Sequence, residues 1–412
     1  MLYKPNDNNE ERFHKSIAFI IVLGQFFALM PLHGVTGETE RSINFTWKSW
    51  KLLYTVLIVI GSLFCVYASF LGAVRQNTDI SLITASMFYG ASCVVQMLFV
   101  ILAKNWSKLI RKWTAIDVGM RSYGYPSRLN ARLKILSAVV LTCATAEHVL
   151  VIVKNIITAS ECLSVEFFEC YFKFVSYPQV FTIAKYSIWA GFMVQIVTTV
   201  ATFSWSYIDL FIMLLSTSLA LRFKQVSKRV EFYVNTSVFY IVLWRNVRED
   251  YNKLGKLCKA LNDNLSYIVL VSFGSNLYFI LVQFFHSLRP KGDALDKGYF
   301  FYSFGFLIGR TICVSLYGSW IHDESQKPLS FLNSVPSSMY NVEIRRFILH
   351  VGIETISLTG KRFFNVTRSI ILSVSDEMCE EIDIWKKERE YTYMEVRKDD
   401  DSDHQSLEVI LN

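Results

Sequence analysis

LLYTVLIVIGSLFCVYASFLGAV, residues 52–74, and ISLITASMFYGASCVVQMLFVILA, residues 80–103, contain no charged residue. A helix rises about 1.5 Å per residue, so about 20 apolar residues cross the roughly 30 Å of hydrocarbon in a bilayer. Each stretch is therefore long enough to form one membrane-spanning helix. Together they predict a polytopic membrane protein.

Four further stretches extend the pattern, at residues 135–153, 186–221, 264–285 and 298–321. Their ionisable side chains are few, namely Glu147, His148, Asp209 and Arg310. The 36 residues of the second stretch would form about 54 Å of helix, so this helix is expected to project beyond one membrane face. We therefore predict an all-α fold with six clear transmembrane helices.

The composition agrees with this interpretation and excludes several others. The 412 residues are 52% hydrophobic, 19% charged and 15% aromatic, and they include 8 cysteines. This balance differs from that of a soluble, disordered or coiled-coil chain, and the cysteines are too sparse for a secreted disulfide scaffold. No P-loop, G-x-S-x-G, C-x-x-C pair or G-x-G-x-x-G motif is present. We therefore expect no enzyme activity, no cofactor and no metal.

The net charge of +7 conceals an uneven distribution. Residues 375–412 contain 13 acids and 5 bases, so an acidic tail follows a body of net charge +15. The tail composition is typical of a solvated, largely disordered segment. We expect membrane lipid, and no nucleic acid, as a partner of the basic body.

Loop charges predict the orientation, because loops rich in Lys and Arg stay in the cytoplasm. Residues 104–134 contain eight bases and one acid, and residues 222–264 contain nine bases and four acids. The intervening residues 159–181 contain three acids and one base, and they are expected outside. The amino terminus is then cytoplasmic. This topology is opposite to that of G-protein-coupled receptors, whose D-R-Y and N-P-x-x-Y motifs are also missing.

The apolar run at residues 16–30 follows Arg12 and Lys15, and it has two interpretations. It resembles the charged and apolar regions of a signal peptide. Gln25 interrupts the run, however, and no small-x-small cleavage site precedes Thr36. A retained half-membrane or interfacial helix is the preferred interpretation.

Cys162 and Cys170 lie together in the loop that is predicted to face outside. The oxidising side of a membrane permits a disulfide between them. The remaining cysteines are predicted to be free thiols in the membrane or the cytosol.

Five strings carry a resemblance to a known family. They are FHKSIAFIIVLGQFFALMPLHGV (13–35), FTWKSWK (45–51), TFSWSYIDLFIMLLS (202–216), IHDESQKPLSFLNSVPS (321–337) and ISLTGKRFFNVTRSIILS (356–373). Together they resemble insect gustatory receptors of the sugar-receptor clade. The resemblance implies a taste receptor that is itself an ion channel at the plasma membrane. It implies seven-helix subunits, with a cytoplasmic amino terminus, that form homo- or hetero-tetramers with other receptor subunits around a cation pore lined by the seventh helix.

The chain departs from this family after residue 373, where the family continues into a long apolar seventh helix with a T-Y and Q-F signature. Here the sequence reads VSDEMCEE (374–381). The apolar residues 363–375 would give about 20 Å of helix, which is about two thirds of the hydrocarbon thickness. Extending this helix would bury five acids at a cost above about 12 kcal/mol. We therefore expect an incomplete seventh helix and a cytoplasmic tail.

Two origins of this tail remain open. Val374 and Ser375 correspond in frame to the common splice donor GTAAGT, so the tail is consistent with intron read-through. Alternatively, it belongs to a real isoform whose acidic tail binds a partner.

Polar groups inside lipid are costly, so those in the outer halves of the spans are candidates for ligand contact. Carboxylates, amides, His and Arg bind sugar hydroxyls, and aromatic faces cover the apolar side of a sugar ring. The candidate ligand-binding residues are Glu147, His148, Arg310, Tyr89, Gln96, Tyr186, Trp189, Gln283, His286 and Tyr302. Competing interpretations are helix-to-helix contacts for Glu147 and His148, a Glu147 ion pair for Arg310, and an interfacial belt for the aromatic residues.

Asp209 lies about 38 Å from the start of its predicted helix, which places it near the inner membrane face. With Trp205 and Tyr207 it is expected to stabilise a cytoplasmic helix bundle that joins subunits, rather than to contact ligand.

Residues 341–358 are predicted to form an irregular amphipathic helix that suits a subunit interface. The family resemblance implies that this region is a cytoplasmic anchor that couples ligand binding to the seventh helix, with His322, Asp323 and Glu324 at its start. Three adjacent side chains point in different directions, so this triplet does not predict a metal or catalytic site.

These features divide the chain into a cytoplasmic amino terminus with a half-membrane helix (1–49), six spans with an extracellular pocket (50–321), an anchor (322–362), a seventh-helix stub (363–375) and the acidic tail (376–412). We expect a subunit of a sugar-gated nonselective cation channel that does not conduct alone. The alternatives are a non-conducting regulatory partner of intact subunits, a non-functional read-through product, and a transporter, although no inverted repeat is detected.

Overall fold

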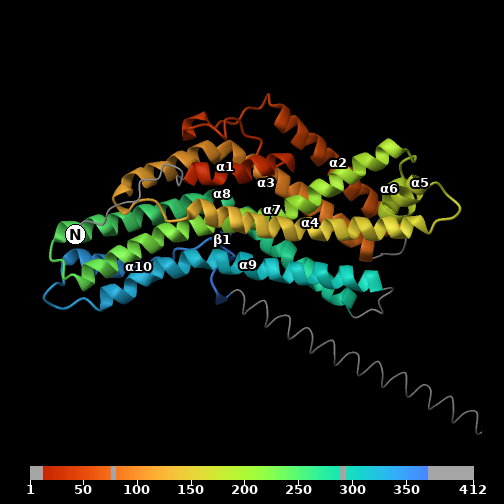
Figure 1. Ribbon diagram of the computed structural model, residues 1–412. Helices are drawn as coiled ribbons and strands as arrows, with labels where there is room; N and C mark the ends of the chain where they lie inside the picture. Colours follow the sequence, from red (N-terminus) through yellow and green to blue (C-terminus); the bar gives the residue numbers. More distant parts are fainter. Residues whose placement is uncertain (1–12, 76–79, 288–293, 370–412) are drawn as a thin grey trace, which may run out of the picture. The chain divides into compact units, whose positions relative to one another are not determined.

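Six long helices form the computed structural model, which describes residues 13–75, 80–287 and 294–369 (Figure 1). They are α2 (Trp50–Arg75), α3 (Ile80–Gly119), α4 (Leu129–Ser160), α7 (Ile188–Asn235), α8 (Ile241–Ser287) and α9 (Ala294–Asn333). Each is long and apolar enough to cross a membrane. The all-α fold with six spans is therefore confirmed, and four of the helices, α3, α7, α8 and α9, extend well past the apolar stretches that predicted them.

Helix α7 is the centre of this bundle. It packs most extensively against α9 and also contacts α1, α2, α3, α4 and α8. Its most apolar window is 67% buried, compared with 33% for α2 and 22% for α4. The exposed apolar side chains of α2 and α4 therefore provide lipid-facing surface, while α7 connects the other helices.

The short helix α1 (Phe13–Phe26) forms from the apolar run near the amino terminus and packs against α3, α4 and α7. The hydroxyl of Tyr207 donates a hydrogen bond to the carbonyl oxygen of Ile20 at 3.0 Å. Gly24 permits this approach, because a Cβ there would lie 2.6 Å from the Tyr207 hydroxyl oxygen. Tyr207 therefore joins α7 to α1, and its role in a cytoplasmic bundle that joins subunits stays a prediction.

Three short helices connect α4 to α7: α5 (Phe167–Glu169), the π-helix η4 (Cys170–Ser176) and α6 (Pro178–Phe181). Cys162 and Cys170 form a disulfide at the start of this connection. The aromatic rings of η4 pack on α7, since Phe172 occupies the space beside Gly191. Two further single turns, η2 (Glu40–Ser42) and η3 (Arg121–Tyr123), lie in the loops that precede α2 and α4.

The region after α9 contains helix α10 (Val342–Ile353) and a hairpin of β1 (Thr359–Gly360) and β2 (Phe364–Asn365), with Thr359 paired to Asn365 in antiparallel register. Asn341 caps α10, because its side-chain oxygen accepts from the Glu343 and Ile344 amides at 3.0 and 3.1 Å. The predicted helix over residues 341–358 is thus too long at its carboxyl end. Residues 354–358 instead run extended toward the hairpin.

Residues 363–368 also differ from the prediction, which made them the first half of a helical stub. Phe363 lies in a turn and Phe364 begins β2, because the extended segment pairs back on β1. Among the described residues of the stub, only Ser369 is helical. Residues 370–375 and the tail at 376–412 lie outside the described residues.

The hairpin is attached to the bundle by α8. The Asn262 side chain donates to the Ser357 carbonyl oxygen at 2.8 Å and accepts from the Thr359 amide at 3.1 Å. Helix α9 approaches on another side, where a Cβ on Gly318 would lie 2.7 Å from a methyl carbon of Val366. The segment that leads out of the bundle is therefore fixed against two of its long helices.

The buried carboxylate of Glu343 connects α10 to α8. It accepts hydrogen bonds from Arg248 Nε at 2.8 Å and from Arg346 Nη1 at 3.1 Å, and Arg245 lies 3.8 Å away. The hydrogen bond from Arg248 lowers the pKa of Glu343 below its ordinary value of 4.5.

A Glu343→Gln variant is expected to unfold at a lower temperature than the wild type at pH 7. A carboxylate with a lowered pKa stabilises the folded chain above its ordinary value, and this contribution disappears as the pH falls through the folded-state pKa. The difference between the two proteins should therefore shrink below pH 4.5. Thermal unfolding of both in detergent across this range measures it, with Arg345→Gln, at an exposed position of the same helix, as the control. An unchanged difference at low pH would contradict the assignment.

Candidate ligand-binding site

A cavity of about 450 Å³ lies among α3, α4, α7, α8, α9 and the η4 connection. Its volume falls within the range typical of small-molecule sites. Of the ten candidates, it is lined by Tyr89, Glu147, His148, Gln283 and His286. These residues come from three helices that are separated in sequence, so the fold brings half of the candidates to one place.

One side of the cavity is built around the carboxylate of Glu147 on α4. Ser303 on α9 donates a hydrogen bond to Glu147 Oε1 at 2.5 Å, and Gln283 Nε2 on α8 lies 3.2 Å from the Ser303 hydroxyl. The buried Gln283 Oε1 has no hydrogen-bond partner among the described residues. This side therefore offers a carboxylate acceptor and an unused amide acceptor to a ligand that carries hydroxyl donors.

The opposite side is formed by phenols and an amide. The hydroxyls of Tyr177 and Tyr171 both donate to Gln195 Oε1 on α7, at 2.9 and 3.3 Å. On α3, Tyr89 shares a 2.8 Å hydrogen bond with Thr198. Burial raises the pKa of Tyr177 well above its ordinary value of 10.0, so this phenol stays neutral at physiological pH.

The aromatic floor consists of Trp205 and Phe279, whose ring centroids lie 4.5 Å apart, with Phe88 at 6.2 Å from Trp205. The ring of Trp205 lines the cavity, and its role in a cytoplasmic bundle that joins subunits stays a prediction. Aromatic faces next to converging polar groups match both sides of a sugar ring.

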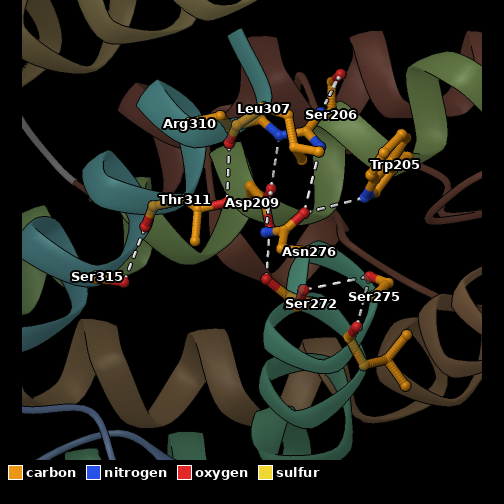
Figure 2. Close-up of polar contacts among 11 residues, drawn as sticks. Trp205, Ser206, Asp209, Ser272, Ser275, Asn276, Leu307, Arg310, Thr311 and Ser315 are labelled. Atoms are coloured by element: carbon orange, nitrogen blue, oxygen red, sulfur yellow. Dashed lines mark hydrogen bonds and ion pairs between the residues drawn. The ribbon is translucent and has the colours of Figure 1, made fainter. Parts of the chain in front are cut away.

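Directly next to the floor lies a buried ion pair, shown in Figure 2, between Asp209 of α7 and Arg310 of α9. Arg310 Nε is 2.9 Å from Asp209 Oδ2, and the two side chains are 0% and 2% exposed. Ser272 and Asn276 of α8 also donate to this carboxylate, the latter at 2.9 Å. The ion pair and its hydrogen bonds therefore join α7, α8 and α9.

This polar cluster is connected to the floor through Trp205. The indole Nε1 donates to Asn276 Oδ1 at 3.1 Å, and the Arg310 guanidinium lies 4.5 Å from the indole ring (Figure 2). The remaining Arg310 hydrogen bonds go to Ser206 and Asn276. Arg310 thus pairs with Asp209 instead of Glu147, and it is not among the residues that line the cavity. Asp209 has a structural role in this cluster, and its role in a cytoplasmic bundle that joins subunits stays a prediction.

Four other candidates also lie outside the cavity lining. Gln96 is fully buried, Tyr186 packs on Phe181, Trp189 is 73% exposed, and the hydroxyl of Tyr302 donates to the Cys143 carbonyl oxygen at 3.0 Å. His148, although it lines the cavity, shares a hydrogen bond with Thr199 at 3.1 Å.

The polar cavity residues that sequence reasoning missed include Ser303, Tyr299, Asn155, Tyr171, Tyr177, Gln195 and Thr198. A signal for part of this set was present. Gln195, Thr198, Thr202 and Trp205 recur at spacings of three and four residues, so they form one face of α7. Such a polar face within an apolar helix indicates a cavity or a contact with another polar helix.

The predicted coupling triplet lies within α9, which continues past residue 321 without a break to Asn333. Glu324 is buried, and its carboxylate accepts from Trp320 Nε1 at 2.9 Å and Lys327 Nζ at 2.6 Å. The main-chain oxygen of Glu324 accepts from Ser227 of α7 at 3.2 Å, whereas that of His322 accepts from Ser325 within α9. Asp323 occupies the intervening position on the same helix.

The fold is that of an insect chemoreceptor of the olfactory type. The olfactory receptor OR5 of Machilis hrabei superimposes with a TM-score of 0.61 at 12% identity, over 90% of this chain and 97% of that chain. Its complex with eugenol gives a TM-score of 0.58.

The sequence model of the trehalose receptor family matches residues 2–379, and the chain belongs to this family. Among relatives from Drosophila melanogaster, the gustatory receptor for sugar taste 64f is 29% identical over 92% of this chain and 83% of its own length. Gustatory receptor 5a for trehalose is also 29% identical, over 90% and 84%. The resemblance to sugar-clade gustatory receptors is thereby confirmed, and the chain is a gustatory receptor homologue with a multi-pass membrane fold.

Proposed function

We propose that this chain is the ligand-binding subunit of a sugar-gated cation channel in the plasma membrane, and that the saccharide occupies the 450 Å³ cavity. The observation that carries the proposal is the combination of Glu147, Gln283 and Gln195 above the aromatic floor of Trp205 and Phe279. Sugar hydroxyls can donate to Glu147 and to Gln283 Oε1 and can accept from the amide nitrogen of Gln195, and the sugar ring matches the floor. The sugar-receptor relatives support the same ligand class.

The polar cluster next to the floor provides a path from ligand to channel. A saccharide that displaces Trp205 changes the geometry of Asn276 and Arg310, which belong to α8 and α9. The same two helices hold the β1–β2 hairpin through Asn262 and Gly318. The proposal therefore assigns gating to a movement of α8 and α9 relative to α7. Assembly as a tetramer with further receptor subunits, and a cytoplasmic amino terminus, belong to this proposal.

The acidic sequence after residue 375 favours a second role, in which the chain binds sugar but contributes no complete pore helix. In that role it acts as a non-conducting regulatory partner in mixed tetramers. The cost of placing five acids in lipid supports this role over self-sufficient conduction. Intron read-through accounts for the same residues, and alignment of the transcript with its genomic locus tests that origin.

Saccharide binding and conduction are tested separately. Purified full-length chain should show saturable, heat-releasing binding of trehalose or sucrose by calorimetry, while glycerol at matched osmolarity should give none. If neither trehalose nor sucrose binds, the ligand assignment is contradicted.

Co-expression with an intact relative then distinguishes the two roles. Suppression of the sugar-evoked current of the relative is expected for a partner that enters mixed tetramers. A sugar-evoked current from this chain expressed alone would contradict the non-conducting role, and an unchanged current on co-expression would indicate a chain that does not assemble.

A further inference from the structure

A groove that takes no part in the proposed sugar response lies where the motif FTWKSWK leads into α2. Its volume is about 440 Å³, and it is lined by Trp47, Lys48, Ser49, Trp50, Leu52, Leu53 and Val56. Both tryptophans are largely open, with Trp47 69% and Trp50 70% exposed. Tryptophan rings concentrate at the headgroup level of a bilayer, where one edge is polar and the rest apolar. The groove therefore has the composition of a membrane interface.

The polar end of α3 lies beside this groove. The hydroxyl of Ser107 donates to the Ile43 carbonyl oxygen at 2.6 Å and so holds the segment before α2 against α3. The Lys104 ammonium lies 6.0 Å from the Trp47 ring, and the Lys51 ammonium lies 5.9 Å from the Trp50 ring. Cations are thus placed at the level of both aromatic rings.

The surrounding charge is strongly positive. Residues 38–56 and 104–116 together contain seven bases and two acids, Glu38 and Glu40. Of these bases, the exposed ones are Arg41, Lys48, Lys104, Lys108, Arg111 and Lys112. Lys51 is instead bonded to the Gln25 side chain at 2.7 Å and the Leu32 carbonyl oxygen at 2.8 Å, so it is a structural member of the groove. A molecule bound here needs a negative charge.

The groove also continues into an apolar wall. Leu53 and Leu57 of α2 are 60% and 57% exposed, on the part of the helix that forms the first membrane span. A free phosphate or sulfate would satisfy the lysines and leave this wall uncovered. An anionic headgroup with attached acyl chains matches the basic rim, the aromatic belt and the apolar wall together.

We propose that this groove binds the headgroup of an anionic glycerophospholipid, whose acyl chain lies along Leu53 and Val56 of α2. The basic segment that follows the apolar part of α3 and includes Lys104 is predicted to face the cytoplasm, where anionic lipids concentrate. The bound lipid fixes the start of α2 and, through Lys51, the end of α1. This proposal is independent of the sugar site.

The test uses full-length chain in detergent, titrated with short-chain phosphatidylserine or phosphatidylcholine while thermal unfolding is followed. Phosphatidylserine is expected to raise the unfolding temperature and phosphatidylcholine to leave it nearly unchanged. The variant K48Q/K104Q/K108Q should bind phosphatidylserine roughly 100-fold more weakly, because each lysine near an anionic headgroup contributes about fivefold. The control K134Q/K228Q/K256Q removes three exposed lysines from α4, α7 and α8 and should bind as the wild type does.

Equal effects of the two lipids, or an equal loss in the control variant, would overturn the proposal by showing a non-specific response. Free phosphoserine that reproduces the full shift would overturn it in favour of a small-anion site. If the triple variant is unstable without lipid, Trp47→Leu replaces it, because Trp47 is exposed and its substitution should weaken phosphatidylserine binding severalfold without unfolding the chain. Unchanged binding by Trp47→Leu would also count against the proposed headgroup site.

Discussion

Replacing Arg310 with methionine is expected to lower the free energy of unfolding by about 3–5 kcal/mol, because it leaves the fully buried carboxylate of Asp209 without its counter-charge. The effect is large for one substitution in any protein, since most cost between about 0.5 and 3 kcal/mol. Thermal or denaturant unfolding of the detergent-purified chain measures it. Retention of wild-type stability by Arg310→Met would contradict the ion pair.

A double variant separates stability from coupling. Asp209→Leu combined with Arg310→Met removes both charges and replaces the pair with apolar side chains, which is often neutral or stabilising. Most of the lost stability should return. The sugar response in a co-expressed channel should not return, because the link from Trp205 to α9 through the guanidinium is still missing. A double variant that regains the response would show that the cluster is purely structural.

The second large effect is expected at Glu147. Its replacement by alanine should weaken saccharide binding roughly 10- to 150-fold, because a hydrogen bond to a charged group contributes about 1.5–3 kcal/mol. Glu147→Gln should show a smaller loss, since the amide oxygen still accepts from Ser303 and from a sugar hydroxyl. Calorimetric titration of the purified variants with trehalose or sucrose measures both losses.

Val149→Ala is the matched control, because Val149 lies on the same helix and is 49% exposed on its outer surface. It should bind sugar as the wild type does. Wild-type affinity in Glu147→Ala, with its folding verified by thermal unfolding, would remove Glu147 from the ligand site.

The six spans could be predicted because each requires only one local property, a run of about 20 uncharged residues. Glu147 was found for a related reason, since a carboxylate within such a run is costly unless it has a partner or a function. Both inferences use information that lies within a single helix, and the way the helices pack does not change that information.

The pairing of Asp209 with Arg310 could not be predicted in this way. Counting residues from the start of the helix placed Asp209 near the inner membrane face, but a partner depends on how α7 and α9 are shifted along each other. That shift is determined by side-chain packing over the whole interface, which one sequence does not reveal. The same limit explains Trp205, whose position on α7 is compatible with a structural role until α3 and α8 are placed around it.

The end of the predicted anchor helix was missed for a local reason. Residues 354–358 were predicted to continue α10, but Ser357 accepts a hydrogen bond from Asn262 of α8 and Leu358 accepts one from the Val366 amide beside β2. Hydrogen bonds to Asn262, which is about 95 residues away in sequence, outweigh the local preference.

Helix α7 has 48 residues and is therefore about 72 Å long, and Asp209 lies slightly to the amino-terminal side of its midpoint. The buried ion pair between Asp209 and Arg310 holds α7 at this position, so we expect the helix to pivot there. A tilt of about 5° around Asp209 would displace the far end at Asn235 by roughly 3 Å, while the residues beside Trp205 would move only a few tenths of an ångström. The two arms of the helix are nearly equal, so the same tilt would move Gln195, about 21 Å from Asp209 in the ligand site, by about 2 Å. A movement of this size at the sugar is therefore sufficient to displace the opposite end of α7 by a comparable amount.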